Sequence, residues 1–368
     1  MPLCKLRETI EQLMSNANVL HFTMNLYYRN DTLLEFSEIF KIEKSIYSSQ
    51  AISDETIPAQ VILKDILERN PLIFYDKTYN LPQNIFLIRF YKGKILIGRK
   101  IRSDLHIQNK INAINCSKLT ASMLLGILSC IKRWRESIEV YYHPLTKTEK
   151  LTVFKDIYTD RLVDIEFPFR YKDYKTKKEK TSPKTGWSIN NNKAVYLGYG
   201  EEHIRRYTIN HFQSTQLMNT RKVVFDPACS TGQFLYELKQ NFPNCKTIGQ
   251  DLSKDMVSYA KKYVDEIHHG DAIQPLVPEH SIDILILRFL NSEVVSTPMA
   301  YRLFTNLLKT IKNDGIIILF GHTPLLIRAK FFLKTSLKII HANGYDNNTN
   351  SIFQYYILSR SKRDATLF

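Results

Sequence analysis

Cysteine is scarce in this chain of 368 residues: there are five, and no two of them form a C-x-x-C pair. This usage excludes a disulfide scaffold and a structural zinc site, so we expect a reduced, intracellular protein without a bound metal. Long apolar runs are also lacking. The longest lies around Met123–Ile131 and is far shorter than the roughly 20 residues that a membrane helix needs. The first residues lack the apolar core of a signal peptide, so we expect a soluble, cytoplasmic protein that does not enter membranes.

Acidic residues are the minority among the charges. Lysine and arginine number 51 against 36 acids, which gives a net charge of +15. Such a balance suits nucleic acid or an anionic substrate. However, the segment 171–186 alone holds six lysines and two acids, and a charge run of this kind is usually a solvated loop. Nucleic acid therefore stays open as a partner without being favoured, and the oligomeric state is left open.

The length suits two domains rather than one. The lysine-rich segment 171–186 contains Pro183 and Gly186 and no apolar period, so we predict a linker there, between an N-terminal domain (1–170) and a C-terminal domain (187–368). The first domain has mixed α+β patterns. We expect helices at 6–24, 58–68 and 118–135, a hairpin at 85–101 that turns at Gly93, and a second hairpin at 138–157.

Strands and helices alternate in the second half. We expect strands at 223–226, 246–251, up to 270, 281–290 and 315–320, with helices at 234–241, 254–263, 301–312 and 325–335. This alternation is typical of a doubly wound parallel sheet. Two further strands joined by a polar turn at Asp346–Asn350 end the chain, which predicts a last antiparallel strand.

The stretch Val223–Gln233, VVFDPACSTGQ, passes from an apolar strand to a carboxylate and then to a run of compact residues. In a doubly wound sheet the first strand-to-helix turn is where a nucleotide-like ligand binds. Small residues let the backbone approach that ligand, and the next helix offers free N–H groups. The Asp226 carboxylate disfavours a pyrophosphate and suits a ligand with a cationic amino group, which points to S-adenosylmethionine (SAM).

Asp226–Gly232 resembles the first motif, D/E-x-G-x-G-x-G, of class I SAM-dependent methyltransferases. That resemblance covers about residues 187–360 and implies a seven-stranded, Rossmann-like C-terminal sheet, to which the N-terminal α+β domain adds a cap. Ala228 and Ser230 replace the first two glycines and only Gly232 is kept, a substitution that is tolerated if the local φ stays negative.

Two further acids follow at the next strand ends. In the family, the acid at Asp251 accepts hydrogen bonds from both ribose hydroxyls, as a carboxylate can from a cis diol. The resemblance further implies that Asp271 accepts from the adenine amino group and that the Ala272 N–H meets a ring nitrogen. Met256 either covers an adenine face or is a core methionine, and Leu252 follows the ribose acid. The predicted cofactor residues are Asp226, Ala228, Ser230, Gly232, Asp251, Leu252, Met256, Asp271 and Ala272.

The acceptor side is less well marked. Arg288 and Asn291 follow the fourth strand, where the family's acceptor-facing residues usually stand; Arg288 either binds an acceptor carboxylate or phosphate or forms an ordinary ion pair. Upstream, Tyr196 and Tyr199 belong to a segment that in the family often closes over the methionine end of SAM, where aromatic faces suit a sulfonium cation. Tyr196, Tyr199 and His203 are the candidate bases, and packing of this segment as an amphipathic helix is the alternative.

Three enzymatic functions remain, beside a SAM-binding regulator without turnover. The first is a methyltransferase that acts on a small molecule of secondary metabolism. The second rests on a weaker resemblance to azetidine-2-carboxylate-forming enzymes, in which the α-amine of SAM attacks its own γ-carbon and methylthioadenosine leaves. The third is an RNA methyltransferase, which the net charge favours and the lack of a recognisable RNA-binding module disfavours. The tetrapeptide motif N/D-P-P-Y/F of DNA adenine methyltransferases is missing from LILRFLNSE (285–293), which argues against DNA adenine methylation.

Overall fold

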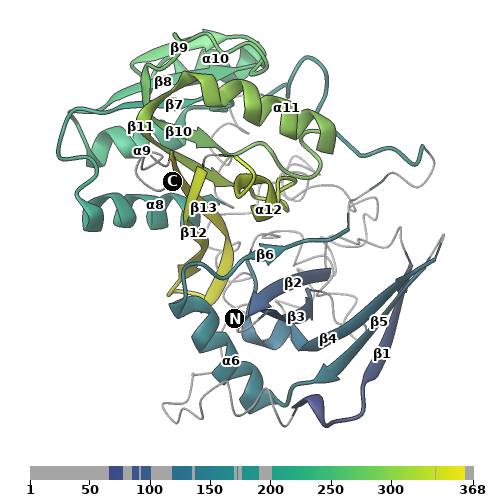
Figure 1. Cartoon of the computed structure of the whole chain (residues 1–368). Coiled ribbons are helices and arrows are strands. Elements are labelled where there is room, and N and C mark those ends of the chain that lie inside the picture. Colours follow the sequence, from purple (N-terminus) through teal and green to yellow (C-terminus); the bar gives the residue numbers. More distant parts are fainter. Residues whose placement is uncertain are drawn as a thin grey trace, which may run out of the picture.

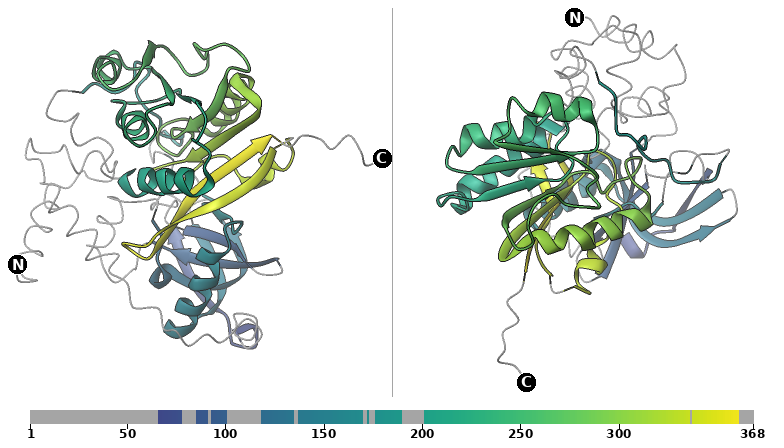
Figure 2. Two further views of the ribbon diagram at one scale, coloured as in Figure 1. Left: turned by 90° about the vertical axis from the view of Figure 1, so that its left-hand side faces the viewer. Right: turned by 90° about the horizontal axis from the view of Figure 1, so that it is seen from above.

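A computed structural model describes residues 66–77, 85–90, 93–100, 118–134, 137–169, 172, 176–189, 201–335 and 337–360. These residues form two sheets, each with its own helices, and the long C-terminal hairpin reaches from one sheet toward the other (Figures 1 and 2). No helix among the residues described is both long and apolar enough to cross a membrane.

The C-terminal sheet has seven strands in the order β12-β13-β11-β10-β7-β8-β9. The five strands β11, β10, β7, β8 and β9 pair in parallel with their neighbours in this order, and β13 runs antiparallel to both β11 and β12. The predicted doubly wound sheet with a last antiparallel strand is therefore confirmed. In chain order the strands are β7 (Val223–Asp226), β8 (Lys246–Asp251), β9 (Glu266–His269), β10 (Ile282–Leu287), β11 (Ile311–Phe320), β12 (Leu337–Asp346) and β13 (Ser351–Arg360).

Helices cover both faces of this sheet (Figure 1). They are α8 (Glu202–Thr215), α9 (Gln233–Asn241), α10 (Lys254–Ala260), α11 (Thr297–Leu307) and α12 (Ala329–Phe332). Because both faces are covered, a central strand such as β10 is a nearly continuous apolar run, IDILIL. Its residues alternate between two clusters: Leu285 and Leu287 pack with α11, whereas Ile284 and Ile286 pack with α8 and α9.

Two of the predicted helices in this half have the wrong extent. The helix expected at 301–312 spans Thr297–Leu307 and is followed by the short turn η5 (Leu308–Thr310), after which β11 already begins at Ile311. Pro298, which fits the first turn of a helix, marks the true start. The helix expected at 325–335 is only the single turn of α12, because Leu325–Ile327 are buried apolar residues in the loop before it.

The N-terminal sheet has six strands in the order β1-β5-β4-β3-β2-β6, all antiparallel. Its elements are β1 (Leu72–Lys77), β2 (Ile85–Phe90), β3 (Lys94–Arg99), η3 (Ala121–Met123), β4 (Leu124–Arg133), β5 (Ser137–Pro144), α6 (Lys147–Thr159) and β6 (Ile165–Glu166). The hairpin predicted at 85–101 is confirmed as β2–β3. Gly93 stands at its turn with a φ of 79°, in the left-handed region that favours glycine.

Two other predictions for the first half are wrong. The helix expected at 118–135 is the strand β4, which pairs with β3 and β5. The hairpin expected at 138–157 is the strand β5 followed by the helix α6. A capping box begins that helix: the Thr146 hydroxyl accepts from the Glu149 N–H, and the Glu149 carboxylate accepts from the Thr146 N–H. The helix expected at 6–24 and most of the one expected at 58–68 lie outside the described residues.

The β12–β13 hairpin ties the two sheets together. Ile352 of β13 bridges to Leu119, and the Gln354 amide donates to the Ile165 carbonyl at 2.7 Å. At the hairpin turn, Lys118 forms an ion pair with Asp346 at 3.1 Å, with both side chains almost fully buried. Residues on the N-terminal side of the predicted linker therefore pack directly against the sheet that carries the site.

Candidate functional site

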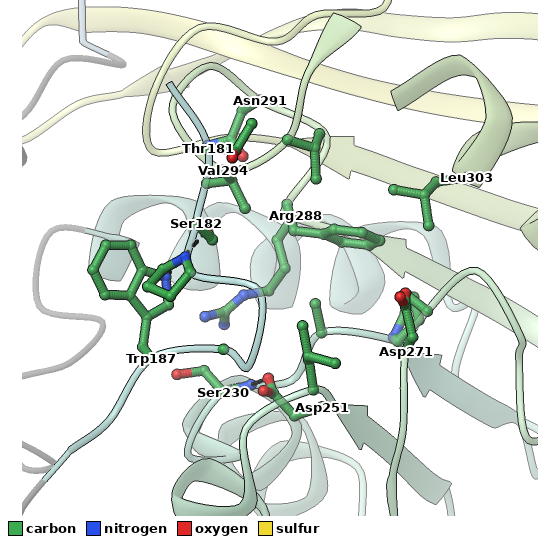
Figure 3. Close-up of a pocket in the computed structure, with 18 of the residues that line it drawn as sticks. Thr181, Ser182, Trp187, Ser230, Asp251, Asp271, Arg288, Asn291, Val294 and Leu303 are labelled. Atoms are coloured by element: carbon green, nitrogen blue, oxygen red, sulfur yellow. Dashed lines mark hydrogen bonds between the residues drawn. The ribbon is translucent and has the colours of Figure 1, made fainter. Parts of the chain in front are cut away.

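A cavity of about 540 Å³ lies at the carboxyl ends of the parallel strands. The loops after β7, β8, β9, β10 and β11 contribute to its walls, together with α11 and the segment 181–187 (Figure 3). This is the edge at which doubly wound sheets bind ligands, and the volume falls within the roughly 300–1,000 Å³ of small-molecule sites. The fold therefore places a ligand-sized cavity where the sequence predicted the cofactor.

The loop after β7 forms the floor of the cavity through Ala228 and Ser230. Ser230 has a φ of 55°, so the expectation of a negative φ at this serine is wrong. The left-handed conformation costs a non-glycine residue roughly 1–2 kcal/mol, and here the Ser230 N–H donates to Asp251 Oδ2 at 2.8 Å. Gly232 has a φ of 80°, and a Cβ there would come within 2.9 Å of Val264 Cγ2. Glycine is therefore required at Gly232, whereas Ser230 is held in place by its hydrogen bond.

Asp251, at the end of β8, lines the cavity with a fixed carboxylate. One oxygen accepts the Ser230 N–H, and the other accepts the Ser253 N–H at 2.9 Å. Burial raises the pKa of this carboxyl, while both backbone N–H groups favour its charged form. Each oxygen keeps a further lone pair for a ligand, which is what the two hydroxyls of a ribose require.

The loop after β9 closes the same end of the cavity. Asp271 Oδ1 accepts the Ile273 N–H at 3.0 Å, and the Gln250 side chain donates to the Asp271 carbonyl at 2.9 Å. Asp271 and Ala272 line the cavity together with Leu252 and Met256. These contacts fix the loop, so that the Asp271 carboxylate and the Ala272 N–H stand together beside apolar side chains, as an adenine site needs.

Asp226 and Gly232 are the two predicted cofactor residues that do not line the cavity. Asp226 is completely buried, and its Oδ1 accepts the Ala228 N–H at 3.0 Å. Burial raises the pKa of this carboxyl to about 7, opposed by the nearby Arg288 guanidinium. Its Oδ2 has no hydrogen-bond partner. The first acid of the motif therefore lies beneath the loop and not on the cavity wall.

Arg288 lines the cavity from the loop after β10 and faces Glu201, which immediately precedes α8. Arg288 Nη1 lies 3.4 Å from Glu201 Oε2, and the two side chains are only 13% and 12% exposed. Glu201, Asp226 and Asp251 raise the pKa of Arg288 against the effect of burial. Of the two interpretations of Arg288, the ion pair is present, and its partner Glu201 was not predicted.

Asn291 also lies on the wall, beyond Arg288 (Figure 3). Its Nδ2 donates to Thr323 Oγ1 at 2.7 Å, and that hydroxyl donates to the Ser292 carbonyl. These bonds define which end of the amide is the donor. The buried Oδ1 has no hydrogen-bond partner, so Asn291 offers an acceptor to a ligand N–H or O–H.

The other candidate bases lie elsewhere. His203 is buried, and its ring packs edge-on against Phe353 with 4.8 Å between ring centroids. Burial and nearby cations lower the pKa of His203 well below its usual value, and this residue does not line the cavity. Tyr196 and Tyr199 lie outside the described residues, so their role stays a prediction.

The end of the predicted linker lies across the cavity as a strap, which we define as residues 176–189. Glu179 accepts from the N–H and the hydroxyl of Thr297, at the start of α11. At the other end, the Trp187 carbonyl accepts from Ser253 Oγ at 2.6 Å, beside α10. The strap is thus anchored at two points, at the start of α11 and at the start of α10. The Trp187 indole donates to Ser182 Oγ at 3.2 Å and lines the cavity (Figure 3).

Trp187 and Glu201 are two of the cavity residues that the sequence analysis did not predict. Trp187 follows the lysine-rich run directly and is one of two tryptophans in the chain. A rare aromatic residue at this position could have indicated a contact with the site. Glu201 is adjacent to Glu202, which pairs with Arg206 on the surface, and nothing in the local pattern distinguishes the two. Among the residues described, no group of three or more His, Cys, Asp or Glu side chains is placed to hold a metal.

Comparison with known proteins shows what the chain is similar to. Residues 224–315 match the family described as methyltransferase domain. Isonocardicin synthase of Nocardia uniformis subsp. tsuyamanensis is 29% identical over 283 residues, which are 76% of this chain and 92% of that protein. Among solved structures, a magnesium protoporphyrin IX methyltransferase from Synechocystis PCC 6803 with bound SAM is 15% identical, covers 48% of this chain and 86% of its own, and has a TM-score of 0.36. A plantazolicin methyltransferase in complex with a triazolic desmethylPZN analog and SAH is 14% identical, covers 46% of this chain and 91% of its own, and has a TM-score of 0.37.

The strand order and the matched domain define an α/β enzyme of the class I methyltransferase fold. More particularly, residues 224–315 match a methyltransferase domain, which agrees with SAM as cofactor or substrate. The recognition made from the sequence is thereby confirmed.

Proposed function

We propose that this enzyme transfers the methyl group of SAM to a small-molecule acceptor of secondary metabolism. The adenosine part of SAM lies against Asp251 and Asp271, and the acceptor occupies the part of the cavity lined by Asn291, Val294 and Val295. The observation that carries this proposal is that one cavity has two kinds of wall. Strand-end carboxylates line one part, and a partly apolar region with one buried, unsatisfied acceptor, Asn291 Oδ1, lines another. The product named in the relative isonocardicin synthase, a small molecule, supports the acceptor class.

The charges on the wall support SAM as the ligand. Glu201, Asp251 and Asp271 face the cavity against Arg288 and Lys184, which leaves an excess of negative charge. SAM is a net cation because it carries a sulfonium and an ammonium against one carboxylate. Opposite charges in a partly buried site attract more strongly than in water. Methyl transfer removes the sulfonium charge, so the product is held less tightly than SAM, which favours its release.

Methyl transfer needs alignment more than acid–base chemistry, since the sulfonium is already a good leaving group. Anchored at both ends, the strap limits the orientations of an acceptor and excludes water. Asn291 Oδ1 accepts a hydrogen bond from the acceptor and orients the nucleophilic atom toward the methyl carbon. In this proposal the cavity wall orients both substrates, and no general base is assigned.

The test is incubation of the purified enzyme with methyl-labelled SAM and panels of phenols, amines and carboxylic acids, followed by mass spectrometry. We expect one acceptor class to gain the label while S-adenosylhomocysteine accumulates in equal amount. Tight SAM binding without transfer to any of these classes, and without methylthioadenosine, would count against an enzyme of this type.

A second use of SAM is supported by one observation: the relative that spans most of this chain is named a synthase and not a methyltransferase. In the cyclisation alternative, the α-amine of SAM attacks its own γ-carbon, the C–S bond breaks, and methylthioadenosine leaves with the electron pair; the amine loses a proton to solvent. Incubation with SAM alone distinguishes the two functions, because only cyclisation yields methylthioadenosine and azetidine-2-carboxylate without an acceptor.

A further inference from the structure

The Arg288–Glu201 pair is poorly satisfied for two buried charges. The guanidinium has five donors, yet among the described residues its only polar contact is the 3.4 Å approach to Glu201. That carboxylate oxygen, Glu201 Oε2, has no hydrogen-bond partner. Buried ion pairs are favourable only when their geometry is good and their remaining donors and acceptors are satisfied. This pair lacks both conditions.

Both members of the pair border the cavity. In Figure 3 the Arg288 guanidinium lies above Ser230 and on the far side of Asp251 from Asp271. The influence of Asp251 on the pKa of Arg288 agrees with this proximity. A ligand whose adenosine contacts Asp271 and Asp251 therefore extends, at its other end, toward Arg288 and Glu201.

The first acid of the motif is not available to that end of the ligand. Asp226 is completely buried, does not line the cavity, and already binds the Ala228 N–H. An ammonium group in the cavity meets Glu201 instead, because Glu201 lines the cavity and its buried Oε2 has no hydrogen-bond partner. A carboxylate in the cavity meets the donors of Arg288, which can bind it through two parallel hydrogen bonds.

We infer that Glu201 and Arg288 bind the amino-acid end of SAM, with Glu201 accepting from the α-ammonium and Arg288 donating to the α-carboxylate. The zwitterion inserts its two charges between the partners of a long ion pair and completes the hydrogen bonds of both. This inference rests on the proposed function in that SAM is the ligand, and it assigns the ammonium to Glu201 in place of the expected Asp226.

The assignment also bears on the choice between the two uses of SAM. A carboxylate next to an amine favours its protonated form, and a protonated α-amine cannot attack the γ-carbon. Glu201 at the ammonium therefore favours methyl transfer over cyclisation. Loss of its charge removes that restraint.

The experiment is calorimetric titration of the full-length enzyme with SAM and with methylthioadenosine, which lacks the amino-acid end. The variants are Glu201→Gln, Arg288→Lys and the uncharged double variant Glu201→Gln/Arg288→Gln. Glu202→Gln is the matched control, since Glu202 is the neighbouring acid, also pairs with an arginine, and does not line the cavity. The ratio of the two dissociation constants is compared within each variant, so that a partly unfolded preparation does not change it.

We expect the wild type to prefer SAM over methylthioadenosine, and each site variant to lose about 10- to 100-fold of that preference, as is typical for hydrogen bonds between charged groups. Glu202→Gln keeps the wild-type ratio. If the affinities for both ligands fall equally, or if the ratio does not change, the assignment of Glu201 and Arg288 is wrong, but SAM can still be the ligand. If the wild type binds neither ligand, the proposed function fails as well.

Discussion

The two ends of the cavity are built differently. At the end proposed for adenosine, Asp251 and Asp271 are held by backbone N–H groups of their own and neighbouring loops. At the end proposed for the amino acid, Arg288 and Glu201 come from distant parts of the chain and leave hydrogen-bonding capacity unused. The first end is arranged before a ligand arrives, whereas in our proposal the second gains its missing partners from the ligand. The predictions below separate these two cases.

The largest effect is expected from Asp251→Ala. This change removes the acceptor of two ribose hydroxyls and also the carboxylate that holds the strained Ser230 N–H. Two charge-assisted hydrogen bonds of about 2 kcal/mol each correspond to about a thousandfold weaker binding. Calorimetry should show this loss equally for SAM and methylthioadenosine. Asp314→Asn, an exposed acid far along the chain, serves as the control, and a loss confined to SAM would contradict the adenosine assignment.

The pH dependence of stability is expected to report on Asp226. Its pKa rises from 3.8 to about 7 on folding, so between these values the folded state holds more protons than the unfolded state. Stability therefore falls as the pH rises through this window, by about 3 kcal/mol from pH 5 to pH 8 for this group. The melting temperature of Asp226→Asn should depend less on pH, and it should rise relative to that of the wild type as the pH increases. Parallel curves would show that Asp226 is ionised throughout.

Asn291→Leu tests the acceptor side alone. The leucine cannot accept a hydrogen bond, so we expect kcat/KM for the acceptor to fall about tenfold, while the calorimetric affinity for SAM stays within about twofold. Asn291→Gln, which retains an amide, should recover part of the activity. Equal losses in SAM affinity and turnover would place Asn291 at the cofactor instead.

Glu179→Gln tests the strap and is expected to have the smallest effect. The amide keeps one acceptor for Thr297 but loses the charge at the start of α11, where a negative group is worth roughly 0.3–1 kcal/mol. We expect KM for the acceptor to rise a few-fold with kcat nearly unchanged, and Glu279→Gln, at an exposed acid, to behave as wild type. A large fall in kcat would assign the strap a role in the chemical step.

That Asp251 and Asp271 line one cavity could be predicted from the sequence, because each acid stands at or just after the end of a strand. Strand ends on one edge of a parallel sheet meet, so the order of these acids was enough. The φ of Ser230 could not be predicted, since it depends on a hydrogen bond to Asp251, 21 residues away. The depth of Asp226 was also hidden, because a motif gives a position along the loop but not the direction of a side chain.

The other end of the cavity depends on contacts that no local pattern records. Arg288 and Glu201 meet only when α8 packs beside β10, and Trp187 reaches the cavity only because the strap is anchored to Thr297 and Ser253.

The wrong predictions for the N-terminal sheet have a similar origin. The apolar residues of β4 fit a helix as well as a strand, and pairing with β3 and β5 decides between them.

The most direct test of the central claim is a crystal structure of the enzyme with S-adenosylhomocysteine bound. We expect adenine beside Asp271 and Ala272, the ribose hydroxyls within hydrogen-bond distance of Asp251, and the amino and carboxyl groups at Glu201 and Arg288. A nucleoside bound elsewhere, or an amino group in contact with Asp226 and not with Glu201, would contradict it.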